Sequence, residues 1–315
     1  MMTSFYSNGK LLITGEYVVL DGALSLAVPT VYGQSLSVKS VQGRHLNWKS
    51  LDEKGKVWFQ ETYDLSSTGN NTLQVTTPTD NPNPSINKAE VSNTLRSILN
   101  EAKKLNPSFL KEEDGYEVTS SLNFPREWGL GSSSTLINNI AQWAKVDAYT
   151  LLWNSFSGSG YDIACAQNNS PITYQLKDKQ PTVKTVPFDP SFRNELYFIY
   201  LNEKQNSREG IAAYRSKELD LYTILPKINS ITQRILTCTK RQQFEKLIHK
   251  HEAIISEILD TPTVKEQFFP DFKGAIKSLG AWGGDFILVA GNKNTADYFR
   301  DKGYHTIIPY TKMVR

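Results

Sequence analysis

The sequence predicts an α+β protein with two lobes. Strand-like runs dominate residues 9 to 50 and return in the second half, whereas long amphipathic helices follow one another between residues 209 and 259. Separate runs of strands and of helices are typical of α+β folds. The chain has 315 residues, which suits one large domain or two of ordinary size, and Pro187–Pro190 marks the expected boundary.

The first lobe is expected to open with short strands. Turn signals separate the apolar runs, because Asp21-Gly22 closes the second run and Pro29 stops the third. The fourth run alternates polar and apolar residues, which is the period of a half-buried strand. The expected strands are Lys10–Ile13, Tyr17–Leu20, Leu24–Val28 and Ser35–Val41.

The middle of the chain mixes helices with strands. Three prolines make Thr77–Ser85 a loop, and the apolar stripe of Asn87–Leu105 has helical spacing. Tyr116–Phe124 is expected to be a strand that leads into a glycine-serine segment, and Thr135–Val146 is again helical. The strands expected after residue 150 are Thr173–Leu176, Val183–Val186, Leu196–Leu201, Phe286–Ala290 and Thr306–Ile308. The helices expected there are Glu209–Asn229, Thr232–Leu259 and Thr295–Lys302.

Charge and composition argue against several classes of protein. The net charge is only +3, with 35 basic and 32 acidic residues intermixed, so no clustered basic face for nucleic acid is expected. No apolar run approaches the ~20 residues of a membrane helix, and Met1–Asn8 lacks the pattern of a signal peptide. The protein is therefore expected to be soluble and cytoplasmic, as a monomer or a homodimer, with no membrane or nucleic-acid partner.

Few residues suggest a disulfide or a metal centre. Cys165 and Cys238 lie far apart and are expected to be two buried thiols. His249 and His251 are two positions apart on a helix and so point in different directions. The basic residues of Lys246–Lys250 alternate with acidic ones, Glu245 and Glu252, which favours a solvated helix face.

The strongest chemical signal is the segment Gly129-Leu130-Gly131-Ser132-Ser133-Ser134. A strand ends before it, its glycines allow a tight turn, and three hydroxyls stand where the next helix begins. Backbone N–H groups at a helix start form an anion site, to which the helix dipole adds. A serine N-cap after a glycine turn is the simpler alternative, but capping alone does not need three serines. The segment matches neither a P-loop nor a dinucleotide-binding fingerprint nor a nucleophile elbow.

Three motifs in order resemble those of the GHMP kinases, the family of galactokinase, homoserine kinase, mevalonate kinase and phosphomevalonate kinase. Pro125–Ser133 matches the family's phosphate loop, P-x-x-x-G-L-G-S-S, in full. Gly9–Tyr17 is similar to the first motif of the mevalonate branch, and Lys277–Asp285 is similar to the third, K-x-x-G-A-G-G-G-D. Gly158–Ala164 resembles the G-x-G-x-D segment that carries the family's candidate base. It also contains Gly-Tyr-Asp-Ile-Ala, which is associated with a subgroup of uncertain substrate.

This resemblance implies a fold, cofactors and site residues. The fold would be a ribosomal-protein-S5-like N-terminal lobe over residues 1–187, which binds ATP, and a ferredoxin-like C-terminal lobe over 188–315, with the active site between them. The cofactors would be ATP and Mg²⁺, with Ser133 as the metal contact. Asp162 would act as the base and Lys10 would pair with it and with the transferred phosphate. The implied nucleotide-binding residues are Gly129, Leu130, Gly131, Ser132, Ser133 and Ser134. The implied acceptor-binding residues are Glu16, Tyr17, Gly280, Ala281, Gly283 and Gly284.

Several readings stay open at this stage. Ser207 and Arg208 are two further candidates for acceptor binding: Arg208 either binds an acceptor carboxylate or phosphate or is a solvated arginine behind a helix N-cap. Without the resemblance, Asp162 would be a turn residue and Glu16 a turn carboxylate. Two departures from the family pattern stand out: Trp143–Gly160 offers only Asp147 in place of a magnesium-binding glutamate, and Trp282 replaces a small residue. The Gly-Glu-Tyr form of the first motif favours mevalonate or phosphomevalonate as acceptor, with a sugar, homoserine or a non-catalytic binding protein as alternatives.

Overall fold

The chain folds into two compact units that are interleaved along the sequence. The computed structural model describes residues 2–65, 73–76, 87–111, 114–204, 207–280, 282 and 284–315, of which 114, 207 and 208 by their backbone alone. Unit 1 comprises Met1–Gly9, Tyr32–Arg126 and Gly131–Gln167, and unit 2 comprises Lys10–Val31, Glu127–Leu130 and Asn168–Arg315. The expected loop Thr77–Ser85 lies largely outside the described residues, and the expected domain boundary after residue 187 stays a prediction.

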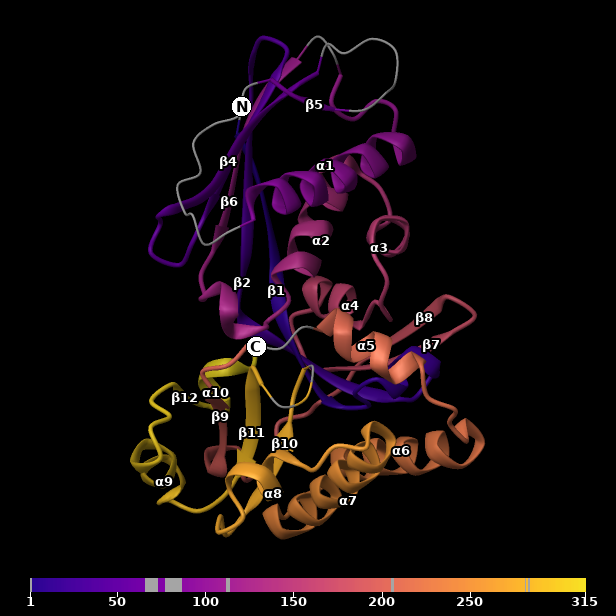
Figure 1. Ribbon diagram of the computed structural model, residues 1–315, viewed down its shortest axis with the longest axis vertical. Helices are drawn as coiled ribbons and strands as arrows, with labels where there is room; N and C mark the ends of the chain where they lie inside the picture. The colour runs from indigo at the N-terminus through magenta and orange to yellow at the C-terminus, as the bar shows by residue number, and fades with distance from the viewer. Residues whose placement is uncertain are drawn as a thin grey trace. The chain divides into compact units, whose positions relative to one another are not determined.

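Unit 1 is a mixed sheet with helices packed against it (Figure 1). The strand order is β5-β4-β3-β6-β2, in which β3 and β6 run parallel and the other neighbours antiparallel. Its strands are β1 (Met2–Thr14) and β2 (Ser25–Gln42), which both continue into unit 2, β3 (His45–Leu51), β4 (Val57–Asp64), β5 (Gln74–Val75) and β6 (Asp114–Leu122). Its helices are α1 (Lys88–Leu105), α2 (Ser132–Ala144), α3 (Ala148–Ser155) and α4 (Tyr161–Gln167).

Local sequence explains why the helices of unit 1 form where they do. The Asn87 side chain accepts the N–H of Glu90 and caps α1, and the expected apolar stripe of this helix is buried. Asp147 caps α3 by accepting the N–H of Thr150, which gives this carboxylate a structural role. One apolar cluster joins the strands to α1 and α2, with Trp48 and Phe59 from the sheet. The expected helices Asn87–Leu105 and Thr135–Val146 are confirmed.

Unit 2 contains a four-stranded antiparallel sheet of order β10-β11-β9-β12. The first part of β2 pairs with β7, which pairs with β8. The strands are β7 (Ile172–Lys177), β8 (Gln180–Thr185), β9 (Leu196–Tyr200), β10 (Ala275–Ser278), β11 (Phe286–Ala290) and β12 (Ile307–Pro309). The α-helices are α5 (Ser207–Arg215), α6 (Leu221–Leu236), α7 (Arg241–Leu259), α8 (Val264–Phe268), α9 (Thr295–Asp301) and α10 (Tyr310–Met313). Short 3₁₀ helices are η1 (Val18–Asp21), η2 (Arg126–Trp128) and η3 (Arg193–Glu195).

Two expected strands are wrong in detail. Tyr17–Leu20 is not a strand, because the chain turns at Gly15 and Tyr17, both with positive φ, and closes the 3₁₀ helix η1. Pro29 does not end a strand either, since β2 passes through it. This proline lies between the residues of β2 that pair with β7 and those that pair with β6.

Three helices, α5, α6 and α7, are found where two long helices were expected in the second half of the chain. The first ends at Arg215, and Asp220 then caps α6 by accepting the N–H of Thr223. Helix α6 continues through the break expected near residue 230 and ends at Leu236 instead. Helices α6 and α7 lie side by side, as Figure 1 shows, and bury apolar residues such as Ile228 and Ile255 in one cluster. An α+β fold is therefore confirmed, with boundaries that the periodicity misplaced.

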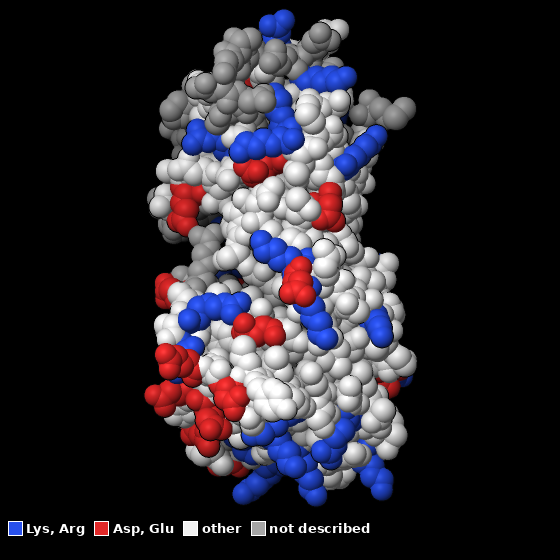
Figure 2. Space-filling model, turned by 90° about the vertical axis from the view of Figure 1, so that its right-hand side faces the viewer, with Lys and Arg blue, Asp and Glu red and all other residues white. Residues whose placement is uncertain are grey.

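The surface and the thiols can be compared with the expectations. On the face shown in Figure 2, Lys and Arg side chains are mixed with Asp and Glu over the upper and middle parts, whereas Lys and Arg gather along the lower edge and Asp and Glu at the lower left. None of the helices in the described part of the chain combines the length and hydropathy that crossing a membrane requires. Cys165 and Cys238 are buried thiols, as expected. The solvated face expected around Lys246–Lys250 is wrong at one position, because Glu252 is buried.

Candidate active site

The predicted phosphate segment runs into the N-terminus of α2. Gly131 stands at the N-cap in the left-handed conformation, at φ 89°, and no side chain caps the helix. The first helical bond is donated by the Thr135 N–H to the Gly131 carbonyl at 3.0 Å, so the N–H groups before it have no acceptor within the helix. Ser133 is exposed, and Ser132 and Ser134 are half-buried. This end of α2 therefore presents backbone N–H groups and hydroxyls in the way an anion site requires.

A buried polar network holds this end of α2 against the sheet of unit 1. The Thr135 hydroxyl donates to Gln34 Oε1 at 2.6 Å, and Gln34 Nε2 donates to Ser120 Oγ at 2.6 Å. Asn139 Nδ2 donates to the Gln34 carbonyl at 2.9 Å and its Oδ1 accepts the Ser7 hydroxyl at 2.7 Å. These residues were not predicted, because single polar residues in helices and strands carry no local signal of burial. They fix the helix start through Thr135, whose hydroxyl also lies 3.0 Å from the Ser132 carbonyl, and these contacts use none of the three serine hydroxyls.

Replacing Thr135 with valine is expected to lower the free energy of unfolding by about 1 to 3 kcal/mol, because the buried Gln34 Oε1 would lose its donor at nearly unchanged volume. Urea denaturation measures the loss. Thr62→Val is the control, since the hydroxyl of Thr62 donates to Asn47 on an exposed part of the sheet. Equal losses in the two variants would contradict the network.

Lys10 lies beside the glycine that opens the phosphate segment. Its Nζ donates to the Gly129 carbonyl at 3.1 Å, and its backbone N–H donates to the Leu130 carbonyl at 3.0 Å. Gly129 has a left-handed φ of 64°, and a Cβ atom there would overlap the carboxylate of Asp285. Asp285 is itself buried and has a φ of 53°. Within unit 2, the first motif, the start of the phosphate segment and the end of the third motif thus meet at Gly129.

Asp162 is the second residue of α4, in unit 1. It follows Gly160, whose φ of 90° turns the chain into the helix, and it is half-buried. Helix α4 packs against α2, so Asp162 and the three serines belong to neighbouring helices of one unit. The expected pairing of Asp162 with Lys10 joins residues of different units and stays a prediction.

Glu16 belongs to a group of four buried ionisable side chains in unit 2, here named the buried ion cluster: Glu16, His251, Glu252 and Lys277. Lys277 Nζ lies 2.5 Å from Glu16 Oε1 and 3.0 Å from Glu252 Oε1. The side chain of Glu252 also accepts the N–H of Ser278 at 3.0 Å and its hydroxyl at 2.8 Å. The cluster thus fastens the turn after β1, helix α7 and strand β10 together.

The cluster changes the protonation of its members. Burial, offset only in part by Lys277, raises the pKa of Glu16 to about 7. Burial, together with the charge of Lys277, lowers the pKa of His251 well below 6.5. Burial also opposes the charge of Lys277, but Glu16 and Glu252 outweigh it and raise the pKa of this lysine. The sequence pointed to Glu16 alone, since the resemblance named it for acceptor binding.

Tyr17 and Trp282 are packed in an apolar cluster of unit 2. The Tyr17 ring stacks on Tyr214 at 5.6 Å between centroids, and burial raises the pKa of Tyr17 to about 12. Trp282 belongs to the same cluster, although its φ of 55° is unusual for a bulky residue. The phenol of Tyr17 also lies against Gly210, where a Cβ atom would overlap it. The large side chain at position 282, where the family has a small residue, is therefore packed within this apolar cluster.

The other predicted acceptor-binding residues are described in part. Gly280 has a left-handed φ of 64°, and Gly284 is buried just before β11. Ala281 and Gly283 lie outside the described residues. The backbone of Ser207 and Arg208 forms the first turn of α5, and their side chains are likewise not among the described groups. The roles of all these residues stay predictions.

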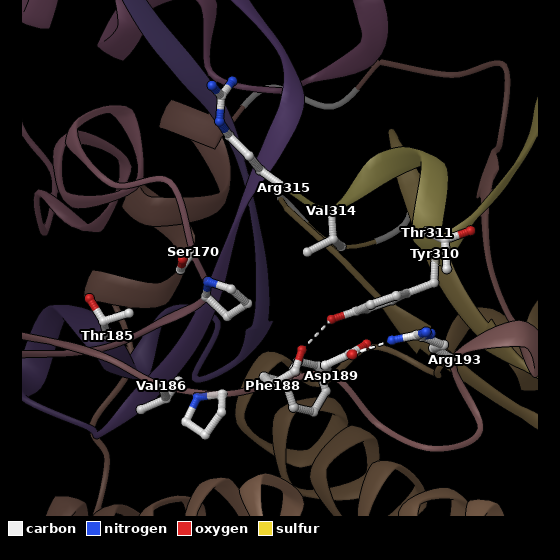
Figure 3. A pocket seen from close by; sticks show the side chains of 12 residues that line it. Ser170, Thr185, Val186, Phe188, Asp189, Arg193, Tyr310, Thr311, Val314 and Arg315 are labelled. Atoms are coloured by element: carbon white, nitrogen blue, oxygen red, sulfur yellow. Dashed lines mark hydrogen bonds and ion pairs between the residues drawn. The ribbon is translucent and has the colours of Figure 1, made fainter.

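A separate cavity in unit 2 contains none of the predicted site residues. It encloses about 610 Å³ beside the C-terminal helix α10, and Figure 3 shows Tyr310 donating from its hydroxyl across it to the Phe188 carbonyl, at 2.7 Å. Arg193 at its edge is paired with Asp189. Among the described residues, no group of three His, Cys, Asp or Glu side chains is arranged to hold a metal ion.

Comparison with known proteins finds relatives by structure alone. No protein-family model and no curated sequence matches the chain significantly. Mevalonate kinase of Methanococcus jannaschii is similar in structure, with a TM-score of 0.65, 14% identity, and coverage of 96% of this chain and 94% of that one. Phosphomevalonate kinase of Streptococcus pneumoniae, in complex with phosphomevalonate and AMPPNP, gives a TM-score of 0.66 at 16% identity and 95% coverage of both chains.

Kinases for other acceptors are similar to the same degree. A D-glycero-D-manno-heptose 1-phosphate kinase from Bacteriodes thetaiotaomicron has a TM-score of 0.65 at 13% identity, and the match covers 98% of this chain and 95% of that one. All these relatives match nearly the whole chain, whichever acceptor their names state. The order of the three sequence motifs and the architecture agree: the chain has the α+β fold of the GHMP kinases.

Proposed function

We propose that the chain is an ATP-dependent small-molecule kinase of the GHMP type, with mevalonate or phosphomevalonate as the favoured acceptor. The first motif, with its Gly-Glu-Tyr ending, supports the mevalonate branch. Structural relatives include kinases named for mevalonate and for phosphomevalonate, the latter bound to an ATP analogue. The galactokinase of Lactococcus lactis and the heptose-phosphate kinase are comparably similar, so sugars stand as rival acceptors.

The observation that carries the proposal is the start of helix α2. Its free backbone N–H groups, its lack of a side-chain cap and its three hydroxyls suit the phosphates of a nucleotide. The hydroxyl of Ser133 is exposed and is a hard oxygen ligand of the kind Mg²⁺ accepts, so it would hold the ion beside phosphate oxygens and water. When bound, the ion would neutralise charge on the phosphates.

Two charged residues are assigned roles in the transfer. The carboxylate of Asp162 would accept the proton of an acceptor hydroxyl as its oxygen attacks the γ-phosphorus. The Lys10 ammonium, held by the Gly129 carbonyl, would stabilise negative charge on the transferred group. An acceptor that is already a phosphate needs no base, because its attacking oxygen carries no proton at neutral pH.

ATP turnover over a panel of acceptors tests the proposal. Mevalonate, phosphomevalonate, galactose and homoserine are each supplied with Mg²⁺ and ATP, and transfer to the acceptor is followed directly. We expect one of the first two to be phosphorylated. If the acceptor is a hydroxyl, Asp162→Asn should lower kcat by about 10²- to 10⁴-fold, because the base is lost.

Asp178→Asn is the matched control, since Asp178 is an exposed aspartate in the turn between β7 and β8. It should retain full turnover. ATP binding by Asp162→Asn is measured separately by calorimetry and should persist. Nucleotide binding without turnover on any acceptor would contradict the kinase and favour the non-catalytic alternative.

A further inference from the structure

The buried ion cluster is sealed from solvent. The exposed fractions of Glu16, His251, Glu252 and Lys277 are 1%, 0%, 3% and 0%. Two of its members adjoin segments that the proposed reaction uses. Glu16 lies in the turn after β1, the strand that carries Lys10, and Lys277 lies on β10, which leads to Gly280. Charges at such depth are stabilised only by their partners, so the charge of the whole cluster can be counted.

The hydrogen bonds fix the protonation of His251. The backbone N–H of Gly15 donates to His251 Nε2 at 2.9 Å. An acceptor nitrogen carries no proton, so the ring is neutral and its proton is on Nδ1. The lowered pKa of His251 agrees with this assignment. With a neutral histidine, one lysine faces two carboxylates, and the cluster has a charge of −1 when both are ionised.

The contacts of the two carboxylates differ. Both oxygens of Glu252 face a donor or a cation, because Oε2 accepts two hydrogen bonds from Ser278 and Oε1 lies 3.0 Å from the ammonium of Lys277. Glu16 has Lys277 on Oε1, but Oε2 has no hydrogen-bond donor among the described residues. The remaining ionisable neighbour is the phenol of Tyr17, in the same turn. An added proton therefore belongs on Glu16.

If Glu16 were protonated, its O–H would compete with the Gly15 N–H for the single lone pair of His251 Nε2. Glu16 Oε2 lies 3.5 Å from His251 Nε2, the atom that already accepts the Gly15 N–H. A protonated Oε2 would be a second donor to a nitrogen with a single lone pair. Protonation would weaken the bond that holds the Gly15 turn, and loss of the proton would restore it.

We propose that Glu16 is a positioning residue: the buried ion cluster binds one exchangeable proton at Glu16, and its release orders the Gly15 turn behind Lys10. The effect on turnover rests on the proposed function, whereas the proton site does not. Glu16 acts through Gly15 and Lys10 without touching the acceptor. The resemblance assigned Glu16 to acceptor binding, and its burial favours this indirect role.

The proton is measured first on the resting protein. Carbon-13 NMR of labelled glutamate side chains should show one carboxyl that titrates near pH 7, where free glutamate would already be ionised. That signal should be absent in Glu16→Gln. It should persist in Glu257→Gln, an exposed carboxylate on the same helix α7 as His251. The titration needs no substrate and is read on wild-type protein.

Turnover is measured second, with the acceptor found above. If only the ionised form is active, kcat/KM of the wild type should fall about tenfold from pH 8 to pH 6, because one proton with a midpoint near 7 is involved. The amide of Glu16→Gln mimics the protonated acid. Because it never carries the ionised group, this variant should be slower than the wild type at pH 8 by more than the roughly tenfold drop expected at pH 6, and it should lose that limb of the profile. Glu257→Gln should keep it.

Each result decides a different point. If every glutamate carboxyl of the wild type titrates below about pH 6, the proton site is wrong. If Glu16 titrates near pH 7 but Glu16→Gln keeps the wild-type profile, the positioning role is wrong. If Glu16 titrates but no acceptor is phosphorylated at any pH, the proposed function fails and the proton site stands.

Discussion

Replacing Lys277 with methionine is expected to lower the free energy of unfolding by about 3 to 5 kcal/mol at neutral pH, because it leaves buried carboxylates without their counter-charge. The two partners are Glu16 and Glu252, at 2.5 and 3.0 Å, and the lysine has no exposed surface. Methionine fills a similar volume, so the change reports the charge more than a cavity. Urea denaturation followed by circular dichroism measures the difference.

The loss should depend on pH in a defined direction. Lys277 lowers the pKa of Glu16, so without this lysine the folded-state pKa of Glu16 rises further above its unfolded value. A carboxyl with a raised pKa stabilises the fold at low pH and loses that contribution as pH rises through the folded pKa. The variant should therefore recover toward pH 5 and be weakest above pH 7. Lys273→Met, four residues earlier and exposed, is the control; a loss no larger than in this control would contradict the argument.

Gly129→Ala should be almost as damaging, with a loss of about 2 to 5 kcal/mol. The left-handed φ of 64° costs an L-residue about 1 to 2 kcal/mol, and the overlap of Cβ with the Asp285 carboxylate adds about 1 to 3 kcal/mol. The same displacement would disturb the Gly129 carbonyl that accepts from Lys10. Thermal unfolding and urea denaturation both report the loss.

Gly55→Ala separates the two contributions. Gly55 has a φ of 75°, and a Cβ atom there would meet nothing within 4 Å. This variant therefore measures the backbone term alone, in the turn between β3 and β4. We expect it to lose about 1 to 2 kcal/mol. If Gly129→Ala loses no more than Gly55→Ala, the close packing of Asp285 has no energetic weight.

The fold was predictable where the signal is local. Helix α1 follows from the helical spacing of the apolar residues in Asn87–Leu105, and this stripe is buried in the structure. Tyr17–Leu20 was predicted wrongly because four apolar residues suit a strand and a 3₁₀ turn equally. The choice depends on the left-handed backbone at Gly15, Tyr17 and Gly22. Likewise, the break between α5 and α6 depends on a single cap at Asp220.

The candidate site was likewise predictable only where its signal is local in the sequence. The segment Gly129–Ser134 was predictable because its turn, hydroxyls and helix start are adjacent in sequence. The buried ion cluster was not, since Glu16 and Lys277 are 261 positions apart and a lysine in a strand usually reaches solvent. Glu252 was placed on a solvated face, and His251 was given no partner, for lack of any sign that α7 buries them. Burial of a charged residue can be predicted only when its partner in the fold is known.

The interleaving of the units also sets an order of events during translation. Residues 10 to 31 leave the ribosome well before residue 168, yet they belong to unit 2, most of which begins there. Glu16 must then wait for Lys277, which is synthesised 261 residues later. The nascent chain thus carries Glu16 without its counter-charge until Lys277 has been synthesised, and a fragment ending at residue 187 would lack Lys277 altogether.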